Sequence, residues 1–74
     1  MDELVVISAE WCGPCKMLKA DMTRRGIPFT NVDASSEEGK ALLAKAGVNA
    51  VPVLKVGDEF YVGAKAMQYV KGIK

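Results

Sequence analysis

The chain has 74 residues, half of them apolar, and its 10 basic and 9 acidic side chains leave a formal net charge of +1. This length suffices for one small domain, residues 1–74, and is too short for two separate hydrophobic cores. The nearly neutral charge gives no strong attraction to nucleic acid or to anionic lipid, so neither is expected as a partner. The sequence also lacks the long apolar run of a membrane span and the basic start of an export signal, so we expect a cytoplasmic protein.

The first half of the chain predicts a strand, a helix and a second strand. Residues 3–8 hold an uninterrupted and mostly β-branched apolar run, which fits a strand buried on both faces. Apolar residues then recur at helical spacing over residues 13–25, and Gly26 can end this helix in the left-handed conformation. Residues 27–33 predict a second strand with Pro28 at its entrance, where a missing N–H is tolerated.

The second half predicts a helix, a hairpin and a final helix. Residues 35–38 have the serine and glutamate spacing of a capping box, and the helix that follows is expected to end at Gly47. A Gly-Asp turn joins residues 53–56 to 59–62, which predicts an antiparallel hairpin, and residues 64–71 predict a short helix. The element order βαβαββα indicates an α/β fold, with a four-stranded mixed sheet flanked by three helices that cover both faces.

The chain has two cysteines, Cys12 and Cys15, in the string Trp-Cys-Gly-Pro-Cys between the first strand and the first helix. A disulfide across so short a loop constrains the unfolded chain little, so a structural bridge is not expected. Residues three apart at a helix start lie on the same side, which brings the two sulfurs within bonding distance. We expect Cys12 to be reachable from solvent and Cys15 to be recessed. The unpaired N–H groups and the dipole of the helix start favour a thiolate at Cys12, the expected nucleophile.

The chemistry that this motif predicts is thiol–disulfide exchange. The thiolate of Cys12 attacks a substrate disulfide and forms a mixed disulfide, and Cys15 then attacks Cys12 and releases the reduced substrate. Pro14 stiffens the turn that sets the sulfur spacing, and Gly13 leaves the flank of the sulfur open to a bulky protein substrate. The protein is left oxidised, so a separate electron donor must reduce it.

The string from Trp11 to Cys15, the elements around it and a later Val51-Pro52 make the chain similar to the thioredoxin family over nearly all of its length. The chain is too short for the extra front strand and helix of thioredoxins proper, so the resemblance implies the minimal, glutaredoxin-sized form of the thioredoxin-like fold. It also implies a cis peptide bond before Pro52, a Val51 backbone to which an extended substrate segment can add, and Trp11 as one wall of that groove.

The same resemblance implies a monomer that reduces disulfide-containing proteins, without a bound metal or organic cofactor, and that thioredoxin reductase or glutathione recycles. Two positions depart from the family patterns. Thioredoxins bury an aspartate six residues before the first cysteine, and this position is Val6, which leaves open what deprotonates Cys15. The tyrosine and the paired glycines of glutaredoxins are replaced by residues 13–14 and 62–65, so a dedicated glutathione site is less expected.

Two other functions remain open: a glutathione-coupled glutaredoxin, and a non-catalytic interaction or metal-binding module. A zinc site needs four ligands, whereas this chain offers two cysteines and no histidine, so such a site would need two chains to share the metal. Met17 can be either a partner contact beside the site or a helix packing residue. A solvated helix face, rather than a binding patch, is expected for the basic residues Lys16, Lys19, Arg24 and Arg25.

Overall fold

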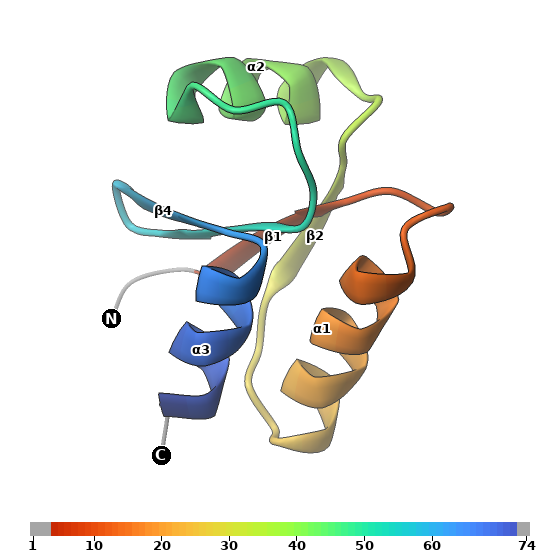
Figure 1. The fold of residues 1–74 in the computed structure, drawn as a ribbon, viewed down its shortest axis with the longest axis vertical. Helices are drawn as coiled ribbons and strands as arrows, with labels where there is room; N and C mark the ends of the chain where they lie inside the picture. Colours follow the sequence, from red (N-terminus) through yellow and green to blue (C-terminus); the bar gives the residue numbers. More distant parts are fainter. Residues whose placement is uncertain (1–3, 73–74) are drawn as a thin grey trace.

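The computed structural model describes residues 4–72, which form one sheet with helices on both faces (Figure 1). The elements are β1 (Leu4–Ser8), α1 (Gly13–Arg24), β2 (Thr30–Asp33), α2 (Glu37–Ala46), β3 (Val53–Val56), β4 (Glu59–Val62) and α3 (Ala64–Gly72). This order and the mixed sheet confirm the predicted α/β fold. Residue 3 of the first predicted strand lies outside the described residues. None of the helices formed by residues 4–72 has the length and apolar character needed to span a membrane.

The strands run in the order β2-β1-β3-β4, so β1 lies inside the sheet. It pairs in parallel with β2 and antiparallel with β3, and β3 and β4 form the predicted hairpin. The register sets Ser8 opposite Asp33 and Ile7 opposite Val53. The carboxyl ends of β1 and β2 and the start of β3 therefore meet at one edge of the sheet, which is where open α/β sheets place their sites.

Successive side chains of the central strands point to opposite faces and form two hydrophobic clusters. In Figure 1, α2 (green) lies on one face, and α1 (orange) and α3 (blue) lie on the other. On the face of α1 and α3, the buried residues are Val6, Leu18, Met22, Leu54, Val56, Ala66 and Val70. On the face of α2, Leu42 and Leu43 pack against the buried residues Ile7, Val32 and Val53. The two clusters fix which helix faces which side of the sheet.

The second strand begins at Thr30, three residues later than predicted. Pro28 has no N–H to donate to β1, and the pairing with β1 begins only at Thr30. Ile27 and Phe29 instead pack their side chains against the cluster on the face of α1 and α3. The helix before this connection ends at Arg24, one residue early, with the predicted left-handed glycine two residues further on.

The predicted capping box at the start of α2 is wrong by one residue. Ser36 caps the helix, and its hydroxyl accepts a hydrogen bond from the N–H of Gly39 at 3.0 Å. The hydroxyl of Ser35 donates instead to the carboxylate of Asp33 at 2.7 Å. The first turn of α2 passes so close to the end of β2 that a Cβ at position 39 would lie 2.0 Å from the carbonyl oxygen of Asp33. A glycine is therefore required at this position.

We predict that Gly39→Ala lowers the free energy of unfolding by about 1–3 kcal/mol, because the new methyl group forces α2 away from β2. Helix propensity alone would favour alanine by about 1 kcal/mol, so the sign of the effect is diagnostic. The matched control is Gly72→Ala, since a Cβ there meets no atom within 4 Å. Urea unfolding of both variants gives the comparison, and a Gly39→Ala protein as stable as the control would contradict the close approach.

Candidate active site

Both cysteines lie where β1 ends and α1 begins. Cys12 is the N-cap residue of α1, and Pro14 occupies the first turn, where its missing N–H costs no helical hydrogen bond. The backbone N–H of Cys12 donates to the carbonyl of Ala9 at 3.1 Å, which closes the loop between strand and helix. Cys15 follows in the first turn and points into the protein, where it is fully buried.

The sulfur of Cys12 caps the helix. It accepts a hydrogen bond from the backbone N–H of Cys15 at 3.3 Å, so it satisfies one of the N–H groups that a helix start leaves without a partner. This N–H and the positive end of the helix dipole both stabilise negative charge on the acceptor atom. The structure therefore places the sulfur of Cys12 at the positive end of the α1 dipole.

Cys12 is far less exposed than expected. Its exposed fraction is 5%, against 0% for Cys15. Cys15 is the more buried of the two, as predicted, but the prediction that Cys12 is reachable from solvent is wrong. The sulfur is held inward by the capping hydrogen bond that it accepts and by a long hydrogen bond, of 4.0 Å, that it donates to the carbonyl oxygen of Val51. Ala9 and Val51 pack with the two cysteines as one small cluster. Only this small fraction of Cys12 is in contact with solvent.

The environment of Cys15 favours its protonated form. Burial raises the pKa of Cys15 to about 11, and a hydrogen bond with the Cys12 sulfur and the negative charge there act in the same direction. A hydrogen bond with the backbone of Ala9 and the positive charge of Lys19 act in the opposite direction. Val6, at the position of the thioredoxin aspartate, is fully buried among apolar side chains. The sequence analysis did not predict that Lys19 lowers the pKa of Cys15. The signal was the spacing, because residues four apart on one helix lie close together.

The remaining residues of the predicted site gather around the same edge of the sheet. The peptide bond between Val51 and Pro52 is cis, as expected, and Pro52 is buried directly before β3. Trp11 is 82% exposed beside the cysteines. Gly13 and Pro14 are also exposed, and a Cβ at Gly13 would have no neighbour within 4 Å. A partner can therefore approach the helix start closely from this side.

A pocket of about 330 Å³ opens between this edge and the start of α2. Its lining includes Trp11 and Val51 and also four residues that the sequence analysis did not single out, namely Asp33, Ser35, Leu43 and Asn49. Two hydrogen bonds from Ser35 hold the pKa of Asp33 below its usual range, so this carboxylate stays ionised in the pocket. The sequence signal for Asp33 and Ser35 was the predicted strand–helix–strand order of the first three elements. A strand–helix–strand unit pairs its two strands in parallel and so sets their carboxyl ends side by side.

Residues 4–61 match the protein-family model described as Glutaredoxin. The chain belongs to the glutaredoxin family. It is 38% identical over 56 residues to the N-acetyl-S-hydroxy-L-cysteine reductase of Bacillus subtilis (strain 168), an overlap of 73% of this chain and 60% of that protein. It is 32% identical over 74 residues to a thioredoxin of Streptomyces clavuligerus, an overlap of 96% of this chain and 65% of that protein. The chain thus spans less than two thirds of the length of these two relatives.

A solved structure of the glutaredoxin-like protein NrdH-redoxin from Escherichia coli has the same fold. It superposes with a TM-score of 0.77 over 97% of this chain and 96% of that chain, at 23% sequence identity. That protein is described as having a thioredoxin-like activity profile. The family match and the shared fold confirm the predicted resemblance to the thioredoxin family and the glutaredoxin-sized body.

The helix cap and the chemistry at Cys12 can be separated by two substitutions. We predict that Cys12→Ser keeps the stability of the reduced protein, because a hydroxyl oxygen accepts the capping hydrogen bond, whereas Cys12→Ala lowers the free energy of unfolding by about 1 kcal/mol. Urea unfolding in excess reductant measures both. Equal stability of the serine and alanine variants would show that the sulfur does not cap α1.

The buried thiol of Cys15 predicts a loss of stability at alkaline pH. The unfolded chain releases this proton near pH 9.0 and the folded protein near about 11, so the folded state holds the proton more tightly. The contribution of Cys15 to the free energy of unfolding is therefore complete below pH 9 and falls as the pH rises toward 11. We predict that the stability difference between the reduced wild type and Cys15→Ser shrinks over this interval in urea titrations. Parallel stability curves up to pH 11 would refute the buried neutral thiol.

Proposed function

We propose that this protein is a thiol–disulfide oxidoreductase that reduces protein disulfides by dithiol exchange between Cys12 and Cys15. The observation that carries the proposal is the hydrogen bond of 3.3 Å from the N–H of Cys15 to the sulfur of Cys12. It places an anion-stabilising helix start under one sulfur and the second thiol directly behind it. Both cysteines are free thiols in the structure, which corresponds to the electron-donating form.

The reaction balances with these two thiols alone. The Cys12 thiolate attacks one sulfur of the substrate disulfide, a bond forms between them, and the other substrate sulfur leaves as a thiolate that takes up a proton. Cys15 then loses its proton and attacks the sulfur of Cys12, which releases the second substrate sulfur. The substrate has gained two electrons, and the protein is left with a disulfide between Cys12 and Cys15.

The state of Cys12 controls when Cys15 becomes reactive. Before a substrate binds, burial, the hydrogen bond with the Cys12 sulfur and, when Cys12 is ionised, its negative charge all raise the pKa of Cys15. Once Cys12 is in a mixed disulfide, its sulfur is neutral, so the influence of its charge is lost and the sulfur is a weaker hydrogen-bond acceptor for Cys15. The backbone of Ala9 and the cation of Lys19 still favour the Cys15 thiolate. The attack of Cys15 on Cys12 is thus favoured after a substrate is bound. It does not need the buried aspartate of thioredoxins, whose position Val6 occupies here.

The residues around Cys12 bind the substrate in this proposal. Exposed Trp11, Gly13 and Pro14 leave room for a protein surface around Cys12. The backbone of Val51, directly before the cis peptide bond, lies beside the sulfur and serves as the edge to which an extended substrate segment adds. Disulfide-containing proteins are therefore the proposed substrates. The proposed setting is a monomer in the reducing cytoplasm, with no nucleic acid or membrane as partner.

A single-turnover assay with insulin tests this proposal. We expect reduced wild-type protein to reduce insulin and to become oxidised in equal amount. Cys15→Ser should stop at a mixed disulfide between Cys12 and insulin, visible by mass spectrometry, because no second thiol resolves it. Cys12→Ser, which keeps the helix cap, should form no such adduct. Full activity of the Cys12→Ser protein would rule out Cys12 as the nucleophile.

The family match supports a second candidate, a glutathione-coupled glutaredoxin. Both candidates share the exchange chemistry and differ in the donor that reduces the oxidised protein. Recycling by NADPH-linked thioredoxin reductase, compared with recycling by glutathione, separates them, and rapid reduction by glutathione alone would favour the second. Within residues 4–72, no three or more His, Cys, Asp or Glu side chains lie together as a group that could hold a metal ion.

A further inference from the structure

A second pocket, of about 420 Å³, lies between α1 and α3, on the side of the sheet opposite α2. Its lining consists of three apolar side chains, three cations and one carboxylate, namely Met17, Ala20, Met67, Arg24, Arg25, Lys71 and Asp21. These seven residues define the α1–α3 groove. None of them takes part in the exchange between the cysteines, so the groove calls for a different explanation.

Basic side chains are concentrated on this face of the protein. Residues 13–25 and 64–72, which are α1 with its C-cap residue and α3, contain six of the ten basic side chains and one of the nine acidic ones. The rest of the chain has four basic and eight acidic side chains. The net charge of +1 therefore hides a strongly uneven distribution, and a local positive field remains on the face of α1 and α3.

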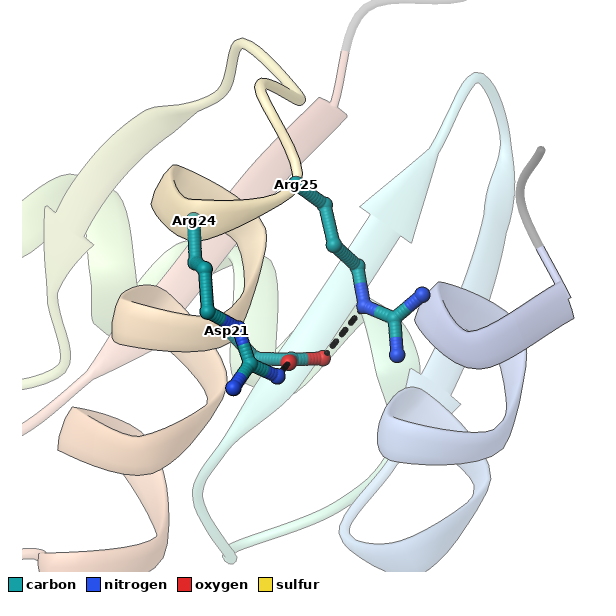
Figure 2. A network of polar contacts seen from close by, with 3 residues as sticks. All are labelled: Asp21, Arg24 and Arg25. Atoms are coloured by element: carbon teal, nitrogen blue, oxygen red, sulfur yellow. Dashed lines mark hydrogen bonds and ion pairs between the residues drawn. The ribbon is translucent and has the colours of Figure 1, made fainter.

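Asp21, the single acidic side chain of α1 and α3, is shared by two arginines (Figure 2). Its carboxylate accepts hydrogen bonds from Arg24 and, at 3.0 Å, from Nε of Arg25, whose side chain extends toward α3. Burial raises the pKa of Asp21, but the hydrogen bonds from Arg25 and Arg24 outweigh burial and hold this pKa below its usual range. One carboxylate between two guanidinium groups leaves one positive charge over, and Lys71 adds another.

Met17 joins the groove to the active site. Its side chain is 65% exposed, so it is not a helix packing residue. It lies three residues after Pro14 and seven before Arg24, and both intervals keep these side chains on one face of α1. A continuous exposed surface therefore leads from the cysteine loop along α1 into the groove. The flexible thioether of methionine adapts to apolar side chains of different shapes, as partner-binding surfaces require.

We infer that the α1–α3 groove binds an acidic segment of the protein whose disulfide Cys12 attacks, and this inference rests on the proposed function. An apolar side chain of the segment packs between the two methionines, and flanking carboxylates pair with Arg24 and Lys71. Arg24 lies ten positions after Pro14 on the helix, a rise of about 15 Å that about five residues of extended chain span. The acidic segment therefore lies roughly five residues from the reacting cysteine of the substrate.

Synthetic peptides test this inference with the whole protein. Each peptide has about twelve residues and one cysteine, held in a mixed disulfide with mercaptoethanol, and carries Glu-Leu-Glu about five residues to one side of the cysteine. Reference peptides have Gln-Leu-Gln in the same place. Reduced protein in excess supplies the two electrons, so no further donor is needed. Two acidic peptides are compared, with Glu-Leu-Glu before or after the cysteine. We expect the faster of the two to react on the order of tenfold faster than its Gln-Leu-Gln reference at low salt. This preference should fade at high salt.

Two charge-matched variants locate the effect. Arg24→Gln with Lys71→Gln removes two positive charges from the groove, and Lys40→Gln with Lys45→Gln removes two exposed charges from α2 on the opposite face. The preference for acidic peptides should be lost in the first variant and kept in the second. Urea unfolding of both confirms that each variant is folded.

The outcomes separate this inference from the function on which it rests. A wild type that reduces acidic and neutral peptides equally fast, or a groove variant that keeps the preference, would overturn the inference and leave the exchange reaction standing. A wild type that reduces no peptide would overturn the proposed function and the inference with it.

Sedimentation of the wild type and the groove variant tests whether a second copy of the chain fills the groove instead. A dimer that the wild type forms and the groove variant does not would assign the groove to a second copy of the chain and overturn the inference.

Discussion

The hydrogen bond from the N–H of Cys15 to the sulfur of Cys12 joins the fold of this protein to its chemistry. A helix start must satisfy its free N–H groups, and here the acceptor is a sulfur rather than the usual hydroxyl or carboxylate oxygen. The same bond turns Cys12 inward, under Val51, and leaves Cys15 as the buried thiol behind it. The burial of both sulfurs and the pKa of Cys15 follow from this one arrangement.

The sheet holds this arrangement in place with segments that lie far apart in the sequence. β1 delivers the cysteine loop, β3 begins directly after the cis peptide bond beside it, and β2 brings Asp33 to the same edge. Separate hydrophobic clusters on the two faces fix α1 and α2 relative to these strands. Both faces of the sheet therefore support the edge that carries the cysteines, while Trp11 and Met17 remain exposed.

Local sequence patterns predicted most of the architecture because helical and strand periodicities, glycine stops and the hairpin turn act over a few residues. The cysteine pair was equally visible, since its spacing and its place at a predicted helix start are read from neighbouring residues. What the sequence could not predict depends on contacts across the fold. Val51, 39 residues from Cys12, covers the sulfur, and the close approach of Gly39 to Asp33 accompanies the shifted cap of α2. The groove, likewise, exists only once α1 and α3 lie side by side.

The most direct measurement is the mass of the protein after equilibration in a series of redox buffers of rising oxidising strength. We predict that the wild type loses the mass of two hydrogen atoms in one reversible step, as a disulfide between Cys12 and Cys15 within a single chain. Two thiols that persist in oxidising buffer, or disulfides that form only between chains, would contradict the pairing of the helix-capping sulfur with the thiol behind it.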